Sequence, residues 1–125
     1  MEGFVYEKLS YAIIGVLYAT FNELGYGYQE RHYQKAISIN LGKAEILYKR
    51  EVYSPITYKE EKIGKYFLDF LIEDKIILEI KKGNKFFKKD IEQVYAYLKN
   101  NKLKLGIIAR FTPKGVTIKR IVNLK

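Results

Sequence analysis

The stretch that decides the fold is residues 66–82, which reads YFLDFLIEDKIILEIKK. Two runs rich in apolar, β-branched and aromatic residues stand on either side of Glu73-Asp74-Lys75. Such runs, separated by a short polar segment, are typical of two strands joined by a tight turn. We therefore expect strands over Ile63–Ile72 and Ile76–Lys82 that pair as a hairpin.

Charged residues interrupt both strands of this hairpin. Side chains alternate between the two faces of a strand, so Glu79 and Lys81 share one face of the second strand. On the first strand, alternation places Phe67, Asp69 and Leu71 together, and Asp69 breaks an otherwise apolar run. The hairpin is therefore expected to bring Asp69 close to Glu79.

Two neighbouring carboxylates in an apolar setting point to a cation. A carboxylate is costly to bury alone, and two of them repel each other unless a positive charge lies between them. Mg²⁺ or Mn²⁺ fits Asp69 and Glu79, because such ions prefer oxygen ligands. Lys81 can then stabilise a phosphate charge or orient an attacking water. The alternative is an ordinary ion pair of Lys81 with Asp69 or Glu79 on a solvated face.

The remainder of the chain predicts helices and strands on both sides of the hairpin. The order ααβββαββ puts a helix between two strands, which implies a crossover and a mixed sheet. We expect one layered α/β domain over residues 1–125. The other expected elements are a helix from Val5 to Leu24 that ends at Gly25 and Gly27, a helix over about Tyr28–Leu41, a strand over Ile46–Tyr58 with a bulge or edge position at Pro55, a helix around Ile91–Leu98, and strands over Leu103–Phe111 and Gly115–Val122.

Polar side chains on two of the predicted helices are further candidates. Glu30 shares a helical stripe with Tyr33 and Ile37, which predicts that it faces inward and joins the metal site. The alternative is a favourable contact with the helix dipole, since Glu30 lies near the helix start. Gln93 and Tyr97 lie one turn apart on the later helix and can bind a phosphate or fix the site lysine, but the residues alone favour ordinary boundary packing.

Composition narrows the classes of function. Cysteine is absent and there is one His among 125 residues, which excludes disulfides and thiolate metal sites and disfavours a Ser–His–Asp triad. The net charge of +9, from 23 basic against 14 acidic residues, favours a polyanionic partner such as nucleic acid. A basic protein without such a partner is the alternative.

A basic segment directly follows the predicted hairpin. Its lysines are candidates for contacts to the phosphate backbone. Phe86 and Phe87 interrupt the segment and are candidates either for stacking on a base or for anchoring the next helix. Arg110 and Lys114 are weaker candidates for phosphate contact. The lysines are Lys82, Lys85, Lys88 and Lys89.

The N-terminal part of the chain predicts neither export nor membrane insertion. Residues 1–8 carry two glutamates and lack a basic leader region, and the apolar stretch Ile13–Phe21 is too short to span a bilayer. We therefore expect a soluble cytoplasmic protein.

Taken together, these motifs resemble a known nuclease pattern. Asp69 followed by Glu79-Ile80-Lys81 resembles the core of the PD-(D/E)xK nuclease superfamily. The segment Gly27–Tyr33 reads G-x-x-E-x-x-Y and, with the long helix before it, is similar to the GxxExxY protein family of that superfamily. The resemblance runs from about Tyr6 to Val122; Leu68 stands where the superfamily motif has Pro.

This resemblance implies a restriction-endonuclease-like core and a role for each matching residue. Asp69 and Glu79 would bind Mg²⁺ or Mn²⁺, and Lys81 would orient the nucleophile or stabilise the pentavalent phosphate. Glu30 would match the first-helix carboxylate of many members and join the metal ligands, and Gln93 with Tyr97 resembles the Q-x-x-x-Y helix of the exonuclease branch. The expected substrate is nucleic acid, DNA in preference to RNA.

Two other interpretations remain open at this point. In the first, the same fold is a binding module whose basic surface holds nucleic acid or a partner protein without cleavage. In the second, the ion pairs are purely structural, which predicts that the Asp69 and Glu79 carboxylates lie apart. Many members of the superfamily act as dimers, so a homodimer is compatible with the resemblance.

Overall fold

The computed structural model describes residues 5–85 and 88–124. In these two ranges the chain forms the helices and strands in the predicted order, and β3 and β5 have the predicted bounds. The second helix begins and ends two residues later than expected. The elements are α1 (Glu7–Leu24), α2 (Glu30–Lys43), β1 (Tyr48–Tyr58), β2 (Glu61–Ile72), β3 (Ile76–Lys82), α3 (Lys88–Asn101), β4 (Leu105–Thr112) and β5 (Gly115–Val122).

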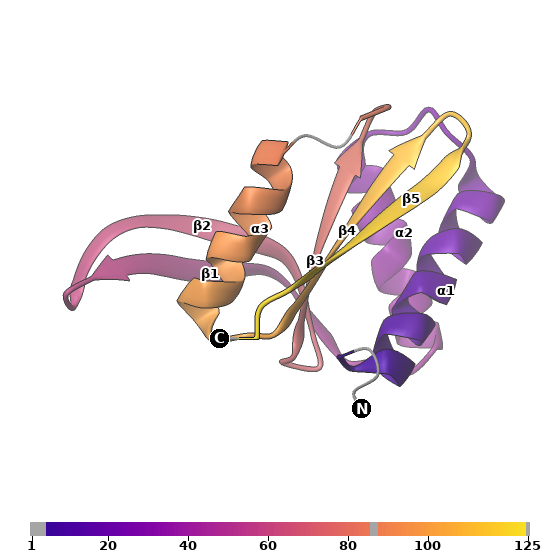
Figure 1. Cartoon of the computed structure of the whole chain (residues 1–125). Helices are drawn as coiled ribbons and strands as arrows, with labels where there is room; N and C mark the ends of the chain where they lie inside the picture. Colours follow the sequence, from indigo (N-terminus) through magenta and orange to yellow (C-terminus); the bar gives the residue numbers. More distant parts are fainter. Residues whose placement is uncertain (1–4, 86–87, 125) are drawn as a thin grey trace.

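The strands form a single mixed sheet in the order β1-β2-β3-β4-β5. Neighbouring strands are antiparallel except β3 and β4, which are parallel and joined through α3 (Figure 1). A parallel pair needs such a crossover, because a tight turn cannot return the chain to the same end of the sheet. The predicted α/β fold with a mixed sheet flanked by helices is therefore confirmed.

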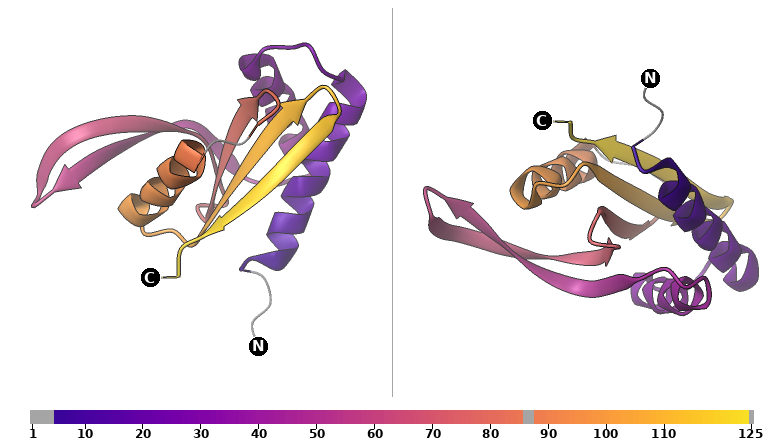
Figure 2. Two further views of the ribbon diagram at one scale, coloured as in Figure 1. Left: turned by 45° about the horizontal axis from the view of Figure 1, so that its top comes forward. Right: turned by 90° about the horizontal axis from the view of Figure 1, so that it is seen from below.

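The helices lie on both faces of the sheet (Figure 2). α1 and α2 pack against one face, where Ile76, Leu78 and Ile80 of β3 are buried among their apolar side chains. α3 packs against the other face, where Ile77 contacts a separate cluster that includes Val94. Alternation along β3 therefore directs Glu79 and Lys81 to the face that α3 covers.

α1 and β2 end at the residues that the sequence predicts. α1 stops before Gly25, whose φ of 75° suits glycine and whose amide donates to the carbonyl of Phe21 at 2.7 Å. The β2–β3 turn comprises three residues, Glu73–Lys75, and Glu73 and Asp74 adopt the left-handed conformation, with φ of 54° and 57°. No helix in the described ranges is long and apolar enough to cross a membrane.

β1 and β2 extend beyond the other strands as a curved arm, residues 52–68, that wraps over α3 (Figure 1). Backbone pairing between β2 and β3 runs only as far as Phe70 and Leu78. Glu51 of β1, which lies opposite Asp69 of β2, has a φ of 50°. Leu68 and Leu71, which strict alternation would put on opposite faces, both pack with the α3 cluster. The predicted shared face of Phe67 and Leu71 is therefore wrong, because the hairpin kinks at Asp69.

The inner face of the arm is fixed to the C-terminal end of α3. The rings of Tyr66 and Tyr97 stack with centroids 3.7 Å apart and planes 16° apart. The Asn101 amide donates to the Tyr66 hydroxyl at 3.0 Å and to the Ser54 hydroxyl at 3.1 Å, and Asn100 donates to the carbonyl of Pro55 at 2.8 Å. These contacts hold the arm in one position relative to α3.

Candidate active site

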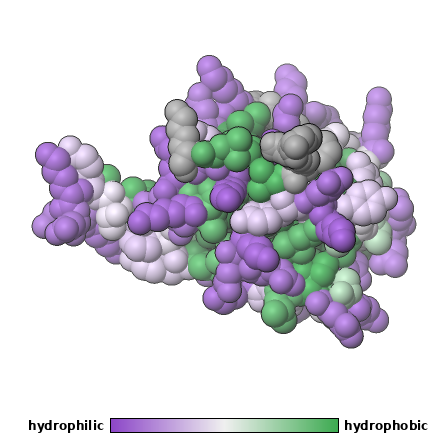
Figure 3. All heavy atoms as spheres, turned by 60° about the horizontal axis from the view of Figure 1, so that its bottom comes forward, coloured by the Kyte–Doolittle hydropathy of each residue, from purple (hydrophilic) through white to green (hydrophobic). Residues whose placement is uncertain are grey.

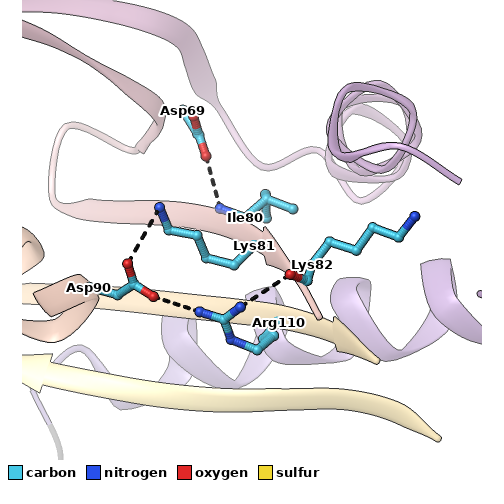
Figure 4. Close-up of polar contacts among 6 residues, drawn as sticks. All are labelled: Asp69, Ile80, Lys81, Lys82, Asp90 and Arg110. Carbon is cyan, nitrogen blue, oxygen red and sulfur yellow. Dashed lines mark hydrogen bonds and ion pairs between the residues drawn. The ribbon is translucent and has the colours of Figure 1, made fainter. Parts of the chain in front are cut away.

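Asp69 and Glu79 lie where β2 separates from β3. Beyond the last backbone pair, side chains take over the hydrogen bonding between the two strands. The Glu79 carboxylate accepts the amide of Asp69 at 3.1 Å. The Asp69 carboxylate accepts the amide of Ile80 at 2.9 Å (Figure 4). The three-residue turn over Glu73–Lys75 pairs Ile72 with Ile76, and this register brings the two acidic residues together.

Burial makes this carboxylate pair hard to ionise. Glu79 is 6% exposed, and burial together with the nearby charge of Asp69 raises its pKa to about 8. Burial likewise raises the pKa of Asp69, although the amide of Ile80 and the charge of Lys81 act in the opposite direction. The structure does not hold these carboxylates apart, as a purely structural interpretation would require.

The donor set fits a hard divalent cation. Two adjacent carboxylates with limited access to water gain most from a positive charge that both can contact. Their ligand atoms are oxygens, and the described residues place no histidine beside them. Mg²⁺ binds through one or two protein carboxylates and leaves its other positions to water or substrate oxygens. The residues present therefore suit Mg²⁺ or Mn²⁺ better than zinc.

Lys81 pairs with a residue that the sequence did not single out for the site. Its ammonium lies 4.0 Å from Asp90 at the start of α3, and its charge also reaches Asp69 and Glu79 (Figure 4). No ion pair within 4.0 Å joins Lys81 to either site carboxylate among the described residues, although both were expected as alternative partners. Lys81 is thus held from the α3 side.

A buried arginine in turn holds Asp90. Arg110 is 4% exposed, donates to Asp90 at 2.7 Å and donates to the carbonyl of Lys82 at 3.2 Å (Figure 4). These bonds connect β4, α3 and the end of β3. The predicted phosphate contact by Arg110 is therefore wrong, because its side chain is buried and paired. A charge inside the apolar run Leu105–Phe111 was a signal that a buried carboxylate would be needed.

Tyr97 and Gln93 lie at different distances from this site. Tyr97 is half-buried on α3, and burial followed by the charge of Glu79 raises the pKa of its phenol to about 12. The smaller effects of Tyr66 and Asp69 act in the same direction. Gln93, one turn earlier, is exposed. The phenol of Tyr97 therefore stands within electrostatic range of both site carboxylates.

The structure does not bring Glu30 to the carboxylate pair. Glu30 is the first residue of α2 and is exposed, whereas Tyr33 and Ile37 on the same stripe are buried. No cluster of three or more acidic or histidine side chains forms within residues 5–85 and 88–124. The expected inward orientation of Glu30 is wrong, because the first turn of α2 projects beyond the packed part of the helix. The favourable interaction of its carboxylate with the positive end of the helix dipole accounts for a glutamate at this position.

The predicted phosphate contacts differ in their surroundings. Lys82 is partly buried, with its ammonium 5.1 Å from the centre of the Tyr26 ring. Lys85, Lys89 and Lys114 are exposed. Lys88 forms an exposed ion pair with Glu92 at 3.8 Å. Phe86 and Phe87 lie outside the described residues.

Comparison with known proteins identifies one family. A family model described as the PD-(D/E)XK nuclease superfamily matches residues 7–121. Among curated proteins no relative matches the chain. Four chains of solved structures are similar, among them "Crystal structure of SSO0001", with a TM-score of 0.48 and 15% identity over 94% of this chain and 78% of that chain.

Proposed function

The chain belongs to the PD-(D/E)XK nuclease superfamily, and on that premise we propose that it is a metal-dependent nuclease that hydrolyses phosphodiester bonds in nucleic acid, DNA in preference to RNA. The observation that carries the proposal is the buried pair Asp69 and Glu79, linked by their own hydrogen bonds at the point where two strands separate. From the motif in Gly27–Tyr33 we further propose that the chain is a member of the GxxExxY family.

Asp69 and Glu79 would hold Mg²⁺ or Mn²⁺ through their carboxylate oxygens. Bound there, the ion would supply Lewis acidity toward a phosphoryl oxygen and neutralise the two acidic side chains. Both carboxylates already accept a main-chain amide, so their orientation is set before any ligand arrives. The site is thereby preorganised for a cation.

Lys81 is the residue that we assign to the developing phosphate charge. An ammonium donates up to three hydrogen bonds, so it can contact a phosphoryl oxygen and still orient the attacking water. A lysine side chain carries about 2 kcal/mol of rotamer entropy when it is unrestrained. Asp90 and Arg110 reduce that freedom and act as positioning residues.

The basic and polar groups around the site are proposed as substrate contacts. Lys82 ends β3, and Lys85, Lys88 and Lys89 come after it. These lysines would contact the phosphate backbone on either side of the scissile bond. Gln93 and Tyr97 would contact the substrate from α3. The net charge of +9 supports a polyanionic substrate.

Cleavage of labelled DNA and RNA, each single- and double-stranded, with Mg²⁺ or Mn²⁺ tests this proposal. Wild type should cut at least one substrate, and Lys81→Ala should abolish cutting. Lys104→Ala is the matched control, since Lys104 is an exposed lysine at the other end of β4 from Arg110. Undiminished cutting by Lys81→Ala would refute the assignment. Salt-dependent binding without cleavage would instead favour a binding module.

A further inference from the structure

The outer face of the arm exposes aromatic side chains. We define this face as Tyr53, Phe67, Pro55 and Lys65, which form two adjacent cross-strand pairs of β1 and β2. Tyr53 is 48% exposed and Phe67 is 53% exposed, with ring centroids 5.7 Å apart. Contiguous exposed apolar surface, unlike single exposed side chains, is a mark of interaction sites.

The inner face of the arm is already occupied, which leaves the outer face for a partner. Val52, Tyr66 and Leu68 pack with the α3 cluster, and the asparagines at the end of α3 bond to Ser54 and Tyr66. The aromatic pair therefore stands on a rigid support. Figure 3 shows the arm projecting from the body, hydrophilic at its tip and less hydrophilic between the tip and the body.

We propose that the outer face of the arm is a stacking surface for an unpaired base of the substrate strand, so that the protein prefers single-stranded or locally unpaired nucleic acid. This inference rests on the proposed function, which puts the scissile phosphate at Asp69. It adds a substrate class, because a base can stack on Tyr53 and Phe67 only when it is free of its duplex partner.

The position of Phe67 along β2 supports this assignment. Phe67 precedes Asp69 by two residues, which corresponds to about 7 Å along a strand. A nucleotide next to the scissile phosphate is of that size. Phe67 faces away from α3, whereas Glu79 and Lys81 face it, so a strand that contacts both passes around the edge of β2 where β2 separates from β3.

The charges around the aromatic pair also fit a nucleotide strand. The Lys62 ammonium lies 5.5 Å from the centre of the Tyr53 ring, and Lys65 shares the outer face. Phosphates on either side of a stacked base would meet these two lysines. Glu60 and Glu61 sit farther out, at the turn between β1 and β2. Glu51, which is exposed, lies opposite Asp69, so negative charge is also present at the end of the arm nearest the site.

A second copy of the chain is a weaker occupant of this surface. β1 is an edge strand, and an edge can pair with another copy through its backbone. Pro55 lacks an amide donor, Glu51 has a left-handed φ of 50°, and the β1–β2 register shifts between Ile56 and Thr57. These irregularities oppose continuous pairing along the edge.

Fluorescence anisotropy with a short labelled DNA single strand, and with the same strand annealed to its complement, tests the proposal without metal. Tyr53→Ala and Phe67→Ala should each weaken single-strand binding by about 5-fold to 150-fold, because a stacked base contributes roughly 1–3 kcal/mol. Duplex binding should change less than single-strand binding. Phe67→Tyr, which keeps the ring, should bind the single strand like wild type.

Tyr11→Ala is the matched control, since Tyr11 is 81% exposed on α1 and away from the arm. Unchanged single-strand affinity in both arm variants would overturn the proposal, as would an equal loss for the duplex or for Tyr11→Ala. A wild-type dimer that dissociates on Phe67→Ala, measured by analytical ultracentrifugation, would assign the face to a second copy and overturn it as well. Binding without cleavage would refute the nuclease function alone, because this assay needs no metal.

Discussion

Asp69 and Glu79 each accept a main-chain amide from the opposite strand, at the point where the β2–β3 backbone ladder ends. Glu79 accepts the amide of Asp69 at 3.1 Å, and Asp69 accepts the amide of Ile80 at 2.9 Å. This exchange keeps two buried carboxylates adjacent although they repel when both are ionised. A cation or a proton relieves that repulsion, and the two compete for the same oxygens.

The first prediction concerns pH and stability without metal. The pKa of Glu79, about 8, lies above its ordinary value of 4.5. Between these pH values the folded chain retains a proton that the unfolded chain releases, so the free energy of unfolding falls as pH rises. The stability contribution of Glu79 is complete below 4.5 and is lost as pH passes about 8. Urea unfolding in EDTA across this range measures the fall.

Glu79→Gln provides the comparison for that measurement, because glutamine does not titrate. As pH rises, the free energy of unfolding of this variant should decrease less than that of wild type. Mg²⁺ should stabilise wild type more at high pH than at low pH, since the ion displaces the proton. Parallel pH profiles for the two proteins would contradict the burial of an adjacent carboxylate pair.

The second prediction concerns the ion pairs behind Lys81. Asp90→Asn removes the charge that the buried Arg110 and Lys81 contact, at 2.7 Å and 4.0 Å. We expect a loss of about 1.5–3 kcal/mol of stability, the usual range for a hydrogen bond to a charged group. Cleavage should slow by about 10-fold to 100-fold with little change in KM, because Lys81 is misplaced and the substrate contacts remain.

Glu92→Gln is the control for this second prediction. It removes a carboxylate from the same helix, where Glu92 makes an exposed pair with Lys88 at 3.8 Å. Exposed pairs of this kind contribute about 0.5 kcal/mol or less, so stability and cleavage should stay near wild type. If Asp90→Asn loses stability but cleaves at the wild-type rate, Asp90 has a structural role only.

The third prediction concerns the contact of α3 with β4. A Cβ atom at Gly106 would lie 2.6 Å from Cγ1 of Val94. Gly106→Ala should therefore destabilise the protein by about 1–3 kcal/mol, the usual cost of overpacking a core. Val94→Ala in the same chain should recover part of that loss. Thermal or urea unfolding of the single and double variants provides the measurement.

Gly15→Ala is the opposite case and serves as the control. Gly15 lies within α1, and a Cβ there would meet nothing within 4 Å. The substitution should stabilise the protein by about 0.5–1 kcal/mol, because glycine is a poor helix former. A neutral Gly106→Ala would mean that α3 packs less closely on β4 than the structure shows.

Local patterns explain how much of this fold could be predicted. The order of the elements follows from helical spacing and from apolar runs, which act within a few residues. The meeting of Asp69 and Glu79 follows from a three-residue turn, which leaves little freedom in the register. The resemblance to nucleases rests on the same short segment, on the motif in Gly27–Tyr33 and on Gln93 with Tyr97.

The features that could not be predicted depend on packing between distant segments. Asp90 and Arg110 are 20 residues apart, and they meet only because the crossover puts the start of α3 beside β4. The exposure of Glu30 depends on how far α2 extends past the sheet, which its own stripe does not determine. The kink at Asp69 involves a left-handed Glu51, a residue type that ordinarily adopts other conformations.

The most direct test of the central claim is anomalous scattering from crystals soaked in Mn²⁺. The ion reports position and binding together, without any assumption about the substrate. We predict an anomalous peak within coordinating distance of one carboxylate oxygen of Asp69 and one of Glu79, and no such peak in crystals of Glu79→Gln. A wild-type map without density between these two residues at saturating Mn²⁺ would contradict the assignment of a metal-dependent site.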